Sequence, residues 1–200
     1  MKLTKILIIV ILIFSFQSWA KADEIKDFQI EGIAIGDNLL DHFSLNHINS
    51  FDKEYYPKSK KFYEQYIHWP EKGDFDIYDG LTISLKQNSY KVYSISGALM
   101  NFKNFNECLN IKNQIVNDII SNFESRVVLD DLDKKLFDYA DNKSKKSQIQ
   151  IRMLDKSALF TVDCIDWSDK AEKKNNWIDN LNVQIYSKEY EDFLRNEAYK

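Results

Sequence analysis

The sequence predicts a single α+β domain, in which an antiparallel sheet of about six or seven strands has helices packed mainly on one face. Several segments alternate apolar and polar residues with a period of two, and turns of hairpin length join them. One long segment instead repeats its apolar residues with the period of a helix. No Pro-rich or Gly/Ser-rich linker divides the 200 residues, which include only five Gly and two Pro.

The first 22 residues have the pattern of a secretory signal peptide. Two lysines precede an almost unbroken apolar run over positions 6–16, and Ala20 and Ala22 offer cleavage sites. The run is shorter than the roughly 20 apolar residues that a membrane-spanning helix needs. We therefore expect residues 1–22 to be removed and residues 23–200 to form the mature domain. Cleavage after Ala20, or retention of the segment as an anchor, are the alternatives.

The expected mature domain is acidic. Removal of Lys2, Lys5 and Lys21 with the leader leaves 24 of the 27 basic residues against 31 acidic ones, a net charge of about −7. The lysines are scattered and do not form the focused basic surface that phosphate binding requires. Nucleic acid is therefore not expected as a partner, and the membrane is expected as one only through the transient signal peptide.

The mature chain is expected to begin with a strand and a short helix. Residues 28–35 alternate as a strand whose phase shifts at Gly32, where a bulge would restore it. Asp37 is the expected N-cap of the short helix that follows. Residues 46–61 are polar and irregular, and we expect them to form a mobile loop.

Three strands are expected next, at residues 62–69, 75–86 and 90–100. The segments between them, 69–73 and 87–89, have the length and composition of turns. An antiparallel meander is therefore the simplest arrangement of the three strands.

The clearest helix covers residues 106–123, with an apolar stripe that includes Cys108. A second, short helix is expected near 129–139. Residues 148–154 and 157–167 then alternate as a second hairpin, which places Cys164 on its inward face.

The C-terminal part is expected to contain a linker, a strand and a helix. Residues 168–176 have the composition of a polar linker, and the strand that follows contains Leu181, Val183 and Ile185. Ser187 is the expected N-cap of a terminal helix. The buried stripe of that helix consists of Tyr190, Phe193 and Leu194.

Cys108 and Cys164 are the only two cysteines. In an exported protein, an even number of widely separated cysteines favours a structural disulfide. Both are expected on inward faces, one on a helix and one on a strand, as a helix-to-sheet disulfide requires. Two separate buried thiols, or a reactive thiol, are the alternatives.

No catalytic, cofactor-binding or metal-binding motif has the required spacing. Gly32 and Gly36 match neither phosphate-binding fingerprint. Residues 74–80 contain three carboxylates and a Gly, but in a calcium-loop register the closing Glu is replaced by Leu85. We therefore assign no catalytic, cofactor or metal residues.

The isolated acidic residues and the histidines are better explained by structural roles than by a catalytic role. Asp130, Asp131 and Asp133 lie where a helix is expected to start, and negative charge there stabilises the helix dipole. The chain has three histidines, which are His42, His47 and His68. Neither a Gly-x-Ser-x-Gly elbow nor a zinc-binding helix accompanies them, so a structural or solvated role is favoured.

Aromatic residues are concentrated between positions 55 and 69, and Tyr78, Tyr90 and Tyr93 are expected on neighbouring strands. The concentrated set is Tyr55, Tyr56, Phe62, Tyr63, Tyr66 and Trp69. One face of a sheet cannot bury them all, and tyrosines outside the core are typical of a surface that binds a protein, peptide or glycan. The alternative is that residues 46–61 fold over the sheet and cover them.

Four segments together resemble an uncharacterised family of small exported proteins from AT-rich bacteria. The segments are residues 35–44, 164–168, 179–181 and 187–194. The resemblance spans most of the mature chain and implies export and a single domain. The family has no assigned activity, so the resemblance supplies no catalytic residue.

The sequence therefore predicts an exported protein, periplasmic or secreted, that acts as a binding or envelope-interaction module. The alternative is a periplasmic hydrolase whose site is assembled only in the fold. Its candidate groups would be Asp37, Asp41 and His42, or Asp163 and Asp166. These groups would have to converge within hydrogen-bond reach in one concave pocket.

Overall fold

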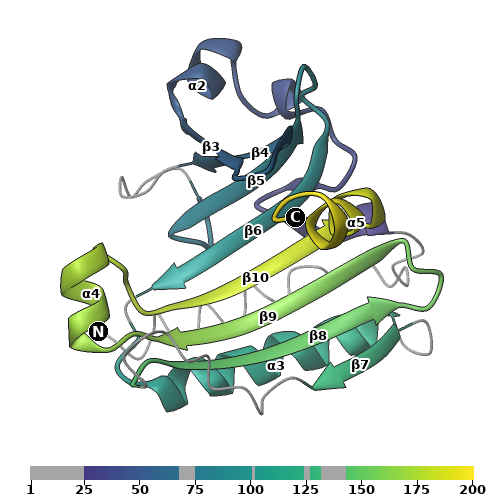
Figure 1. The fold of residues 1–200 in the computed structure, drawn as a ribbon. Helices are drawn as coiled ribbons and strands as arrows, with labels where there is room; N and C mark the ends of the chain where they lie inside the picture. The colour runs from purple at the N-terminus through teal and green to yellow at the C-terminus, as the bar shows by residue number, and fades with distance from the viewer. Residues whose placement is uncertain (1–24, 68–74, 101, 124–126, 132–142) are drawn as a thin grey trace.

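The computed structural model of the chain describes residues 25–67, 75–100, 102–123, 127–131 and 143–200 (Figure 1). The expected signal peptide, His68, the turn at 69–73, Asp74 and Asp133 lie outside the described residues. An eight-stranded antiparallel sheet has the order β3-β4-β5-β6-β10-β9-β8-β7, and β1 and β2 form a separate two-stranded sheet. The predicted antiparallel α+β fold is confirmed, and the main sheet is larger than the six or seven strands expected.

The strands are β1 Gln29–Ile30, β2 Ile33–Ala34, β3 Asp52–Tyr56, β4 Ser59–Ile67, β5 Gly80–Lys86, β6 Val92–Met100, β7 Val127–Asp131, β8 Lys145–Met153, β9 Ala158–Asp166 and β10 Asn180–Ser187. The α-helices are α2 Leu45–Ser50, α3 Phe105–Phe123, α4 Asp169–Asn175 and α5 Lys188–Asn196, and the 3-10 helices are η1 Ile25–Asp27 and η2 Leu39–Asp41.

The main sheet consists of two four-stranded meanders. β3 to β6 form the first and β7 to β10 the second, and the last strand of each pairs with that of the other at the centre of the sheet. In this central pair Ile95 of β6 lies opposite Ile185 of β10. Helix α3 connects the two meanders, and α5 follows the second.

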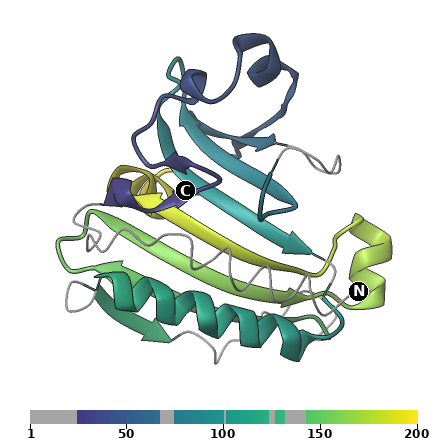
Figure 2. The same cartoon turned by 180° about the vertical axis from the view of Figure 1, so that it is seen from behind.

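The two longest helices lie on opposite faces of the sheet. Ile185 of β10 belongs to the core cluster that contains Cys108, Val116 and Phe123 of α3, whereas Tyr186, the next residue, packs in the cluster of α5. Successive strand residues point to opposite faces, so α3 and α5 must be on different sides. Figure 1 shows α5 in front of the sheet and α3 behind it, and Figure 2 brings α3 to the front. Helices α2 and α3 both contribute to the larger core cluster, as expected for helices mainly on one face, whereas α5 packs on the other face.

The face covered by α3, which we call the apolar face, holds most of the buried apolar residues. Phe160 of β9 is fully buried, with its ring centroid 5.3 Å from that of Phe123 on α3 and 5.1 Å from that of Phe28. The helix stripe and the alternating strands that predicted this core are confirmed over α3, β5, β6, β8, β9 and β10.

The segment expected as one strand over 28–35 is a tight hairpin. Glu31 and Gly32 both have positive φ, at 51° and 76°, so the chain reverses at the position where a bulge was expected. The Glu31 carboxylate accepts hydrogen bonds of 2.8–2.9 Å from the backbone N–H groups of residues 76–78. Because these N–H groups donate to the Glu31 side chain and not to a neighbouring strand, residues 76–78 are not part of a strand. The strand that was expected from residue 75 therefore starts at Gly80. The N-cap of the short helix is Asn38 and not Asp37.

The expected loop at 46–61 is instead helix α2 and strand β3, followed by the start of β4. The Ser44 hydroxyl caps α2. Gln65 of β4 donates a hydrogen bond of 2.6 Å from its side-chain amide to the carbonyl of Ile48, so α2 is fixed to the sheet.

Two further expectations are corrected. Residues 127–131 form β7, which pairs with β8, so Asp130 and Asp131 lie in a strand, and the remainder of the helix expected near 129–139 lies outside the described residues. The polar linker expected at 168–176 contains helix α4, capped by Ser168. In contrast, the second hairpin, the strand at 181–185 and the Ser187 cap of α5 are confirmed.

Candidate functional site

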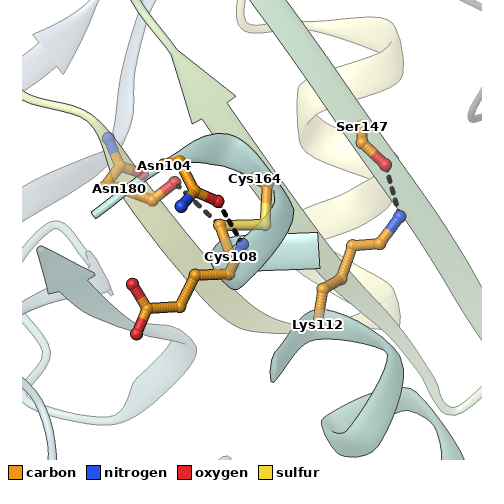
Figure 3. Close-up of a disulfide and its surroundings, with 7 residues drawn as sticks. Asn104, Cys108, Lys112, Ser147, Cys164 and Asn180 are labelled. Atoms are coloured by element: carbon orange, nitrogen blue, oxygen red, sulfur yellow. Dashed lines mark hydrogen bonds between the residues drawn. A yellow bond between two sulfur atoms is a disulfide. The ribbon is translucent and has the colours of Figure 1, made fainter. Parts of the chain in front are cut away.

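The disulfide Cys108–Cys164 joins α3 to β9 on the apolar face (Figure 3). The Cα atoms are 6.0 Å apart, and the described residues include no free cysteine. The predicted bridge is confirmed, and the inward faces of the helix and strand account for it. Its two residues are fully enclosed in the core, so the bridge has a structural role.

Lys112 lies one helical turn after Cys108, in the buried stripe of α3. It is 1% exposed, and its ammonium group donates a hydrogen bond to the Ser147 hydroxyl of β8. Figure 3 shows the lysine extending from the helix toward the strand beside the disulfide. The sequence analysis missed this contact, although Lys112 falls four residues from both Cys108 and Val116 on the buried stripe.

The opposite face of the sheet, which we call the polar face, carries a row of six neutral hydrogen-bonding side chains across six strands. The register places them opposite one another in pairs from β4 to β8. The polar row consists of Tyr66, Thr82, Ser96, Gln184, Thr161 and Gln150. Neighbouring strands are about 4.8 Å apart, so the side chains of the row are regularly spaced. Ser96 and Thr161 are buried, and the other four are half-buried.

The polar row continues into a second set of polar residues along the strands. Asn182, Asp163 and Gln148 lie opposite one another on β10, β9 and β8. Asn182 also accepts a hydrogen bond from the Ser96 hydroxyl, and Gln184 donates one of 3.2 Å to Ser94. The centre of the polar face is therefore a hydrogen-bonded network and not an apolar core.

One end of the polar row meets a group of tyrosines around the Glu64 carboxylate. The hydroxyl groups of Tyr56, Tyr66 and Tyr190 donate to Glu64 at 2.6, 3.0 and 3.0 Å. Tyr66 also lies 2.9 Å from the Glu54 carboxylate. We call these five residues the acid–tyrosine cluster. Because Tyr190 belongs to α5, the cluster fixes that helix to β4.

The three tyrosine hydroxyls of the cluster are held in the neutral form. Burial raises the pKa of Tyr56, Tyr66 and Tyr190 above the ordinary value of 10.0, and the negative charge of Glu64 raises it further. Burial also raises the pKa of Tyr186, which donates a hydrogen bond of 2.5 Å to Gln184. These groups therefore act as hydrogen-bond donors at neutral pH and not as bases.

A second polar contact joins α5 to β8, in addition to the contact of Tyr190 with β4. The Arg152 guanidinium of β8 makes two hydrogen bonds, of 2.6 and 2.7 Å, to the Glu191 carboxylate. Arg195 of the same helix donates to Glu191 at 2.9 Å. The hydrogen bonds from Arg152 lower the pKa of Glu191 below its ordinary value of 4.5.

Asp163 is the most deeply buried acid among those whose burial the structure describes. Its carboxylate is 3.3 Å from the ammonium group of Lys146. Burial raises the pKa of Asp163, and the charge of Lys146 and the contact with Gln148 offset part of that shift. The arrangement is that of a paired, buried acid.

Of the residues considered for a hydrolase, His42 and Asp37 are brought into contact, whereas Asp163 and Asp166 are kept apart. His42 and Asp37 lie 3.1 Å apart, but the Asp37 carboxylate also accepts the backbone N–H of Ala34 at 2.9 Å, and Asp41 is exposed. Asp163 points to the polar face, whereas Asp166 lies three residues further along β9 and pairs with Lys145 at 3.0 Å. An odd separation in a strand places Asp163 and Asp166 on opposite faces.

The aromatic residues are divided between the two faces, as the alternation requires. Tyr63 packs in the core of the apolar face, with Tyr55 5.5 Å away, whereas Phe62 packs against Tyr93 and α5 on the polar face. Residues 46–56 do not cover them as a loop, because they form α2 and β3. Tyr199 remains 63% exposed, and its ring packs 5.6 Å from that of Tyr56.

No protein-family model matches the chain, and no curated protein matches it. Within the described ranges, no helix has the length and apolar character needed to cross a membrane. The described part of the chain also brings no three His, Cys, Asp or Glu side chains into a group that could hold a metal ion.

Proposed function

We propose that the protein is an exported binding module, periplasmic or secreted, that recognises its ligand with the polar face of the sheet. The observation that carries this proposal is the polar row, which crosses six strands without a charged side chain. Core positions are usually apolar and surface positions frequently charged. Neutral amide and hydroxyl groups in register are instead suited to hydrogen-bonding a neutral ligand.

The tyrosines at the end of the row favour the same function. Tyr66, the last residue of the row, is half-buried, and Tyr199, which packs against Tyr56, is exposed, so both offer an aromatic surface with a polar tip. A glycan or an extended peptide combines apolar faces with regularly spaced hydrogen-bonding groups. The proposed ligand is therefore a glycan, a peptide or a protein segment of the cell envelope.

The test is a thermal-shift screen of the purified mature protein against glycans, peptides and envelope fractions. A ligand of the polar face should stabilise the wild-type protein. The combined substitutions Thr82→Val and Gln150→Ala should weaken its binding about tenfold by removing two polar contacts. Gln87→Ala, in an exposed turn, is the matched control. Absence of stabilisation by every member of the panel, or equal binding by both variants, would contradict the proposal.

A hydrolase remains the second proposed function, and the Asp37–His42 contact is the observation that favours it. The expected behaviour is cleavage of a fluorogenic ester or peptide that His42→Ala abolishes while the melting temperature is unchanged. Activity that survives this substitution would exclude the pair as its source.

A further inference from the structure

A pocket of about 310 Å³ lies between α3 and the start of β8, on the apolar face and away from the polar row. Its lining residues are Phe105, Leu109, Lys112, Asn113, Lys145, Lys146 and Ser147. Two of the seven lining side chains are apolar and five carry hydrogen-bonding or charged groups, so polar contacts dominate the pocket. The volume is at the lower end of the range for such sites, so the pocket suits a small ligand.

Lys112 gives the pocket its chemical character. Removal of an ammonium group from water costs several kcal/mol unless hydrogen bonds and charges compensate it. The ammonium of Lys112 donates a hydrogen bond to the hydroxyl of Ser147, a residue that is itself 8% exposed, and both residues line the pocket. An apolar side chain at this position would continue the buried stripe of α3, so packing alone does not require a lysine.

Each of the two lysines that β8 contributes to the pocket is paired with an acid. Lys145 pairs with Asp166 at 3.0 Å, and its ammonium group also lies 5.8 Å from the centre of the Phe105 ring. Lys146 pairs with Asp163, and that carboxylate on the opposite face also attracts Lys112 electrostatically. Lys112 and Lys145 therefore bring positive charge to the pocket, and Asp166, which is not one of its lining residues, is paired with Lys145.

We propose that this pocket binds a small organic carboxylate with a short apolar tail. Lys112 and Ser147 would hold the carboxylate at the inner end, and Lys145 would contact it from β8. The apolar tail would lie on Phe105 and Leu109. The pocket shares no residue with the polar row, so the proposal does not depend on the proposed function.

The test is an NMR titration of the full mature protein with sodium hexanoate, with hexylamine and inorganic phosphate as comparison probes. Saturable shifts of the Leu109, Asn113 and Ser147 amides are expected for hexanoate alone. Lys112→Met should weaken the binding about tenfold or more, because it removes the buried charge. Lys60→Met, at an exposed position of β4, is the matched control and should bind as the wild type does.

A second pair of variants keeps the test decisive if Lys112→Met does not fold. Asp166→Asn removes the acid paired with Lys145 and should strengthen hexanoate binding severalfold, whereas Lys145→Met should weaken it. Absence of saturable shifts with hexanoate would overturn the proposal. Equal shifts with hexylamine or phosphate would overturn it too, as would equal affinities in the Asp166→Asn and Lys145→Met variants.

Discussion

The two faces of the sheet are formed by alternate residues of the same strands, yet they are built in different ways. The apolar face has a continuous core beneath α3, and a disulfide links that helix to β9. The polar face has a small aromatic cluster beneath α5, and side-chain hydrogen bonds around Glu64 and Glu191 hold that helix in place. The difference teaches that one sheet can bury a continuous apolar core on one face and hold a hydrogen-bonded polar network on the other.

Loss of the disulfide should lower the free energy of unfolding more than any other change, because the disulfide links α3 to β9 in the core of the apolar face. The bridged cysteines are separated by 56 positions in the sequence. For a loop of this length, the chain-entropy relation predicts that combined Cys108→Ala and Cys164→Ala substitution lowers the free energy of unfolding by about 4 kcal/mol. Urea denaturation measures the loss. A loss of less than about 1 kcal/mol would show that the bridge contributes little to this face.

Loss of the Arg152–Glu191 contact should cause the next largest decrease in the free energy of unfolding, because this contact fixes α5 to β8. Arg152→Met should cost about 2 kcal/mol at neutral pH, because the Glu191 carboxylate loses two charge-assisted hydrogen bonds. Arg195→Met, whose side chain is exposed, is the matched control and should cost about 0.5 kcal/mol or less. Equal losses in the two variants would contradict the proposed fixing of α5 by β8.

The same contact predicts a pH dependence on the acidic side. The pKa of Glu191 is lowered in the folded state, so its contribution is complete above about pH 4.5 and is lost as the pH falls through the folded value. The difference in stability between wild type and Arg152→Met should therefore disappear on acidification. Urea denaturation at a series of pH values measures this, and a constant difference down to the lowest pH would contradict it.

The acid–tyrosine cluster predicts a pH dependence on the basic side. The pKa values of Tyr56 and Tyr190 are raised by folding, so stability is complete below the unfolded value of about 10 and is lost as the pH rises. Each tyrosine adds a slope of about 1.4 kcal/mol per pH unit above that value. Tyr190→Phe should reduce the slope by this amount in denaturation curves. The comparison between pH 7 and 9 is the control, and there the two slopes should agree.

Removal of the cap of α5 should have the smallest effect. The Ser187 hydroxyl accepts the backbone N–H of Tyr190 at 3.3 Å, and Ser187→Ala should cost about 1 kcal/mol. Hydrogen exchange of residues 190–194 should accelerate. Ser168→Ala removes the equivalent cap of α4 and should leave the exchange of α5 unchanged. Acceleration of α5 in both variants would show that the effect is not local.

The sequence was sufficient to predict those parts of the fold where one side of an element is buried. The period of two over 81–85 and 181–185 and the helical stripe around Cys108 follow directly from burial on the apolar face. The disulfide could be predicted from the same faces. In contrast, the first four residues of β3 are exposed on both sides, so this strand has no alternation that could distinguish it from a loop.

The polar face could not be predicted, because it depends on contacts between distant strands. The polar row exists only because β6 and β10 pair with Ser96 opposite Gln184. Glu64 and Tyr190 come together only when α5 packs on β4. The concentration of tyrosines indicated that a second surface existed, but its position follows from strand order and register.

Site-specific photo-crosslinking in cells that produce the protein tests most directly the proposal that the polar face is the binding surface. Benzoylphenylalanine at position 199 would lie beside the acid–tyrosine cluster. At position 55, where the native tyrosine is 41% exposed, it would lie on the opposite face of the sheet. We predict one discrete adduct from position 199 that the combined Thr82→Val and Gln150→Ala substitutions weaken, and none from position 55. Adducts of equal yield at both positions, or none at position 199, would contradict the proposal.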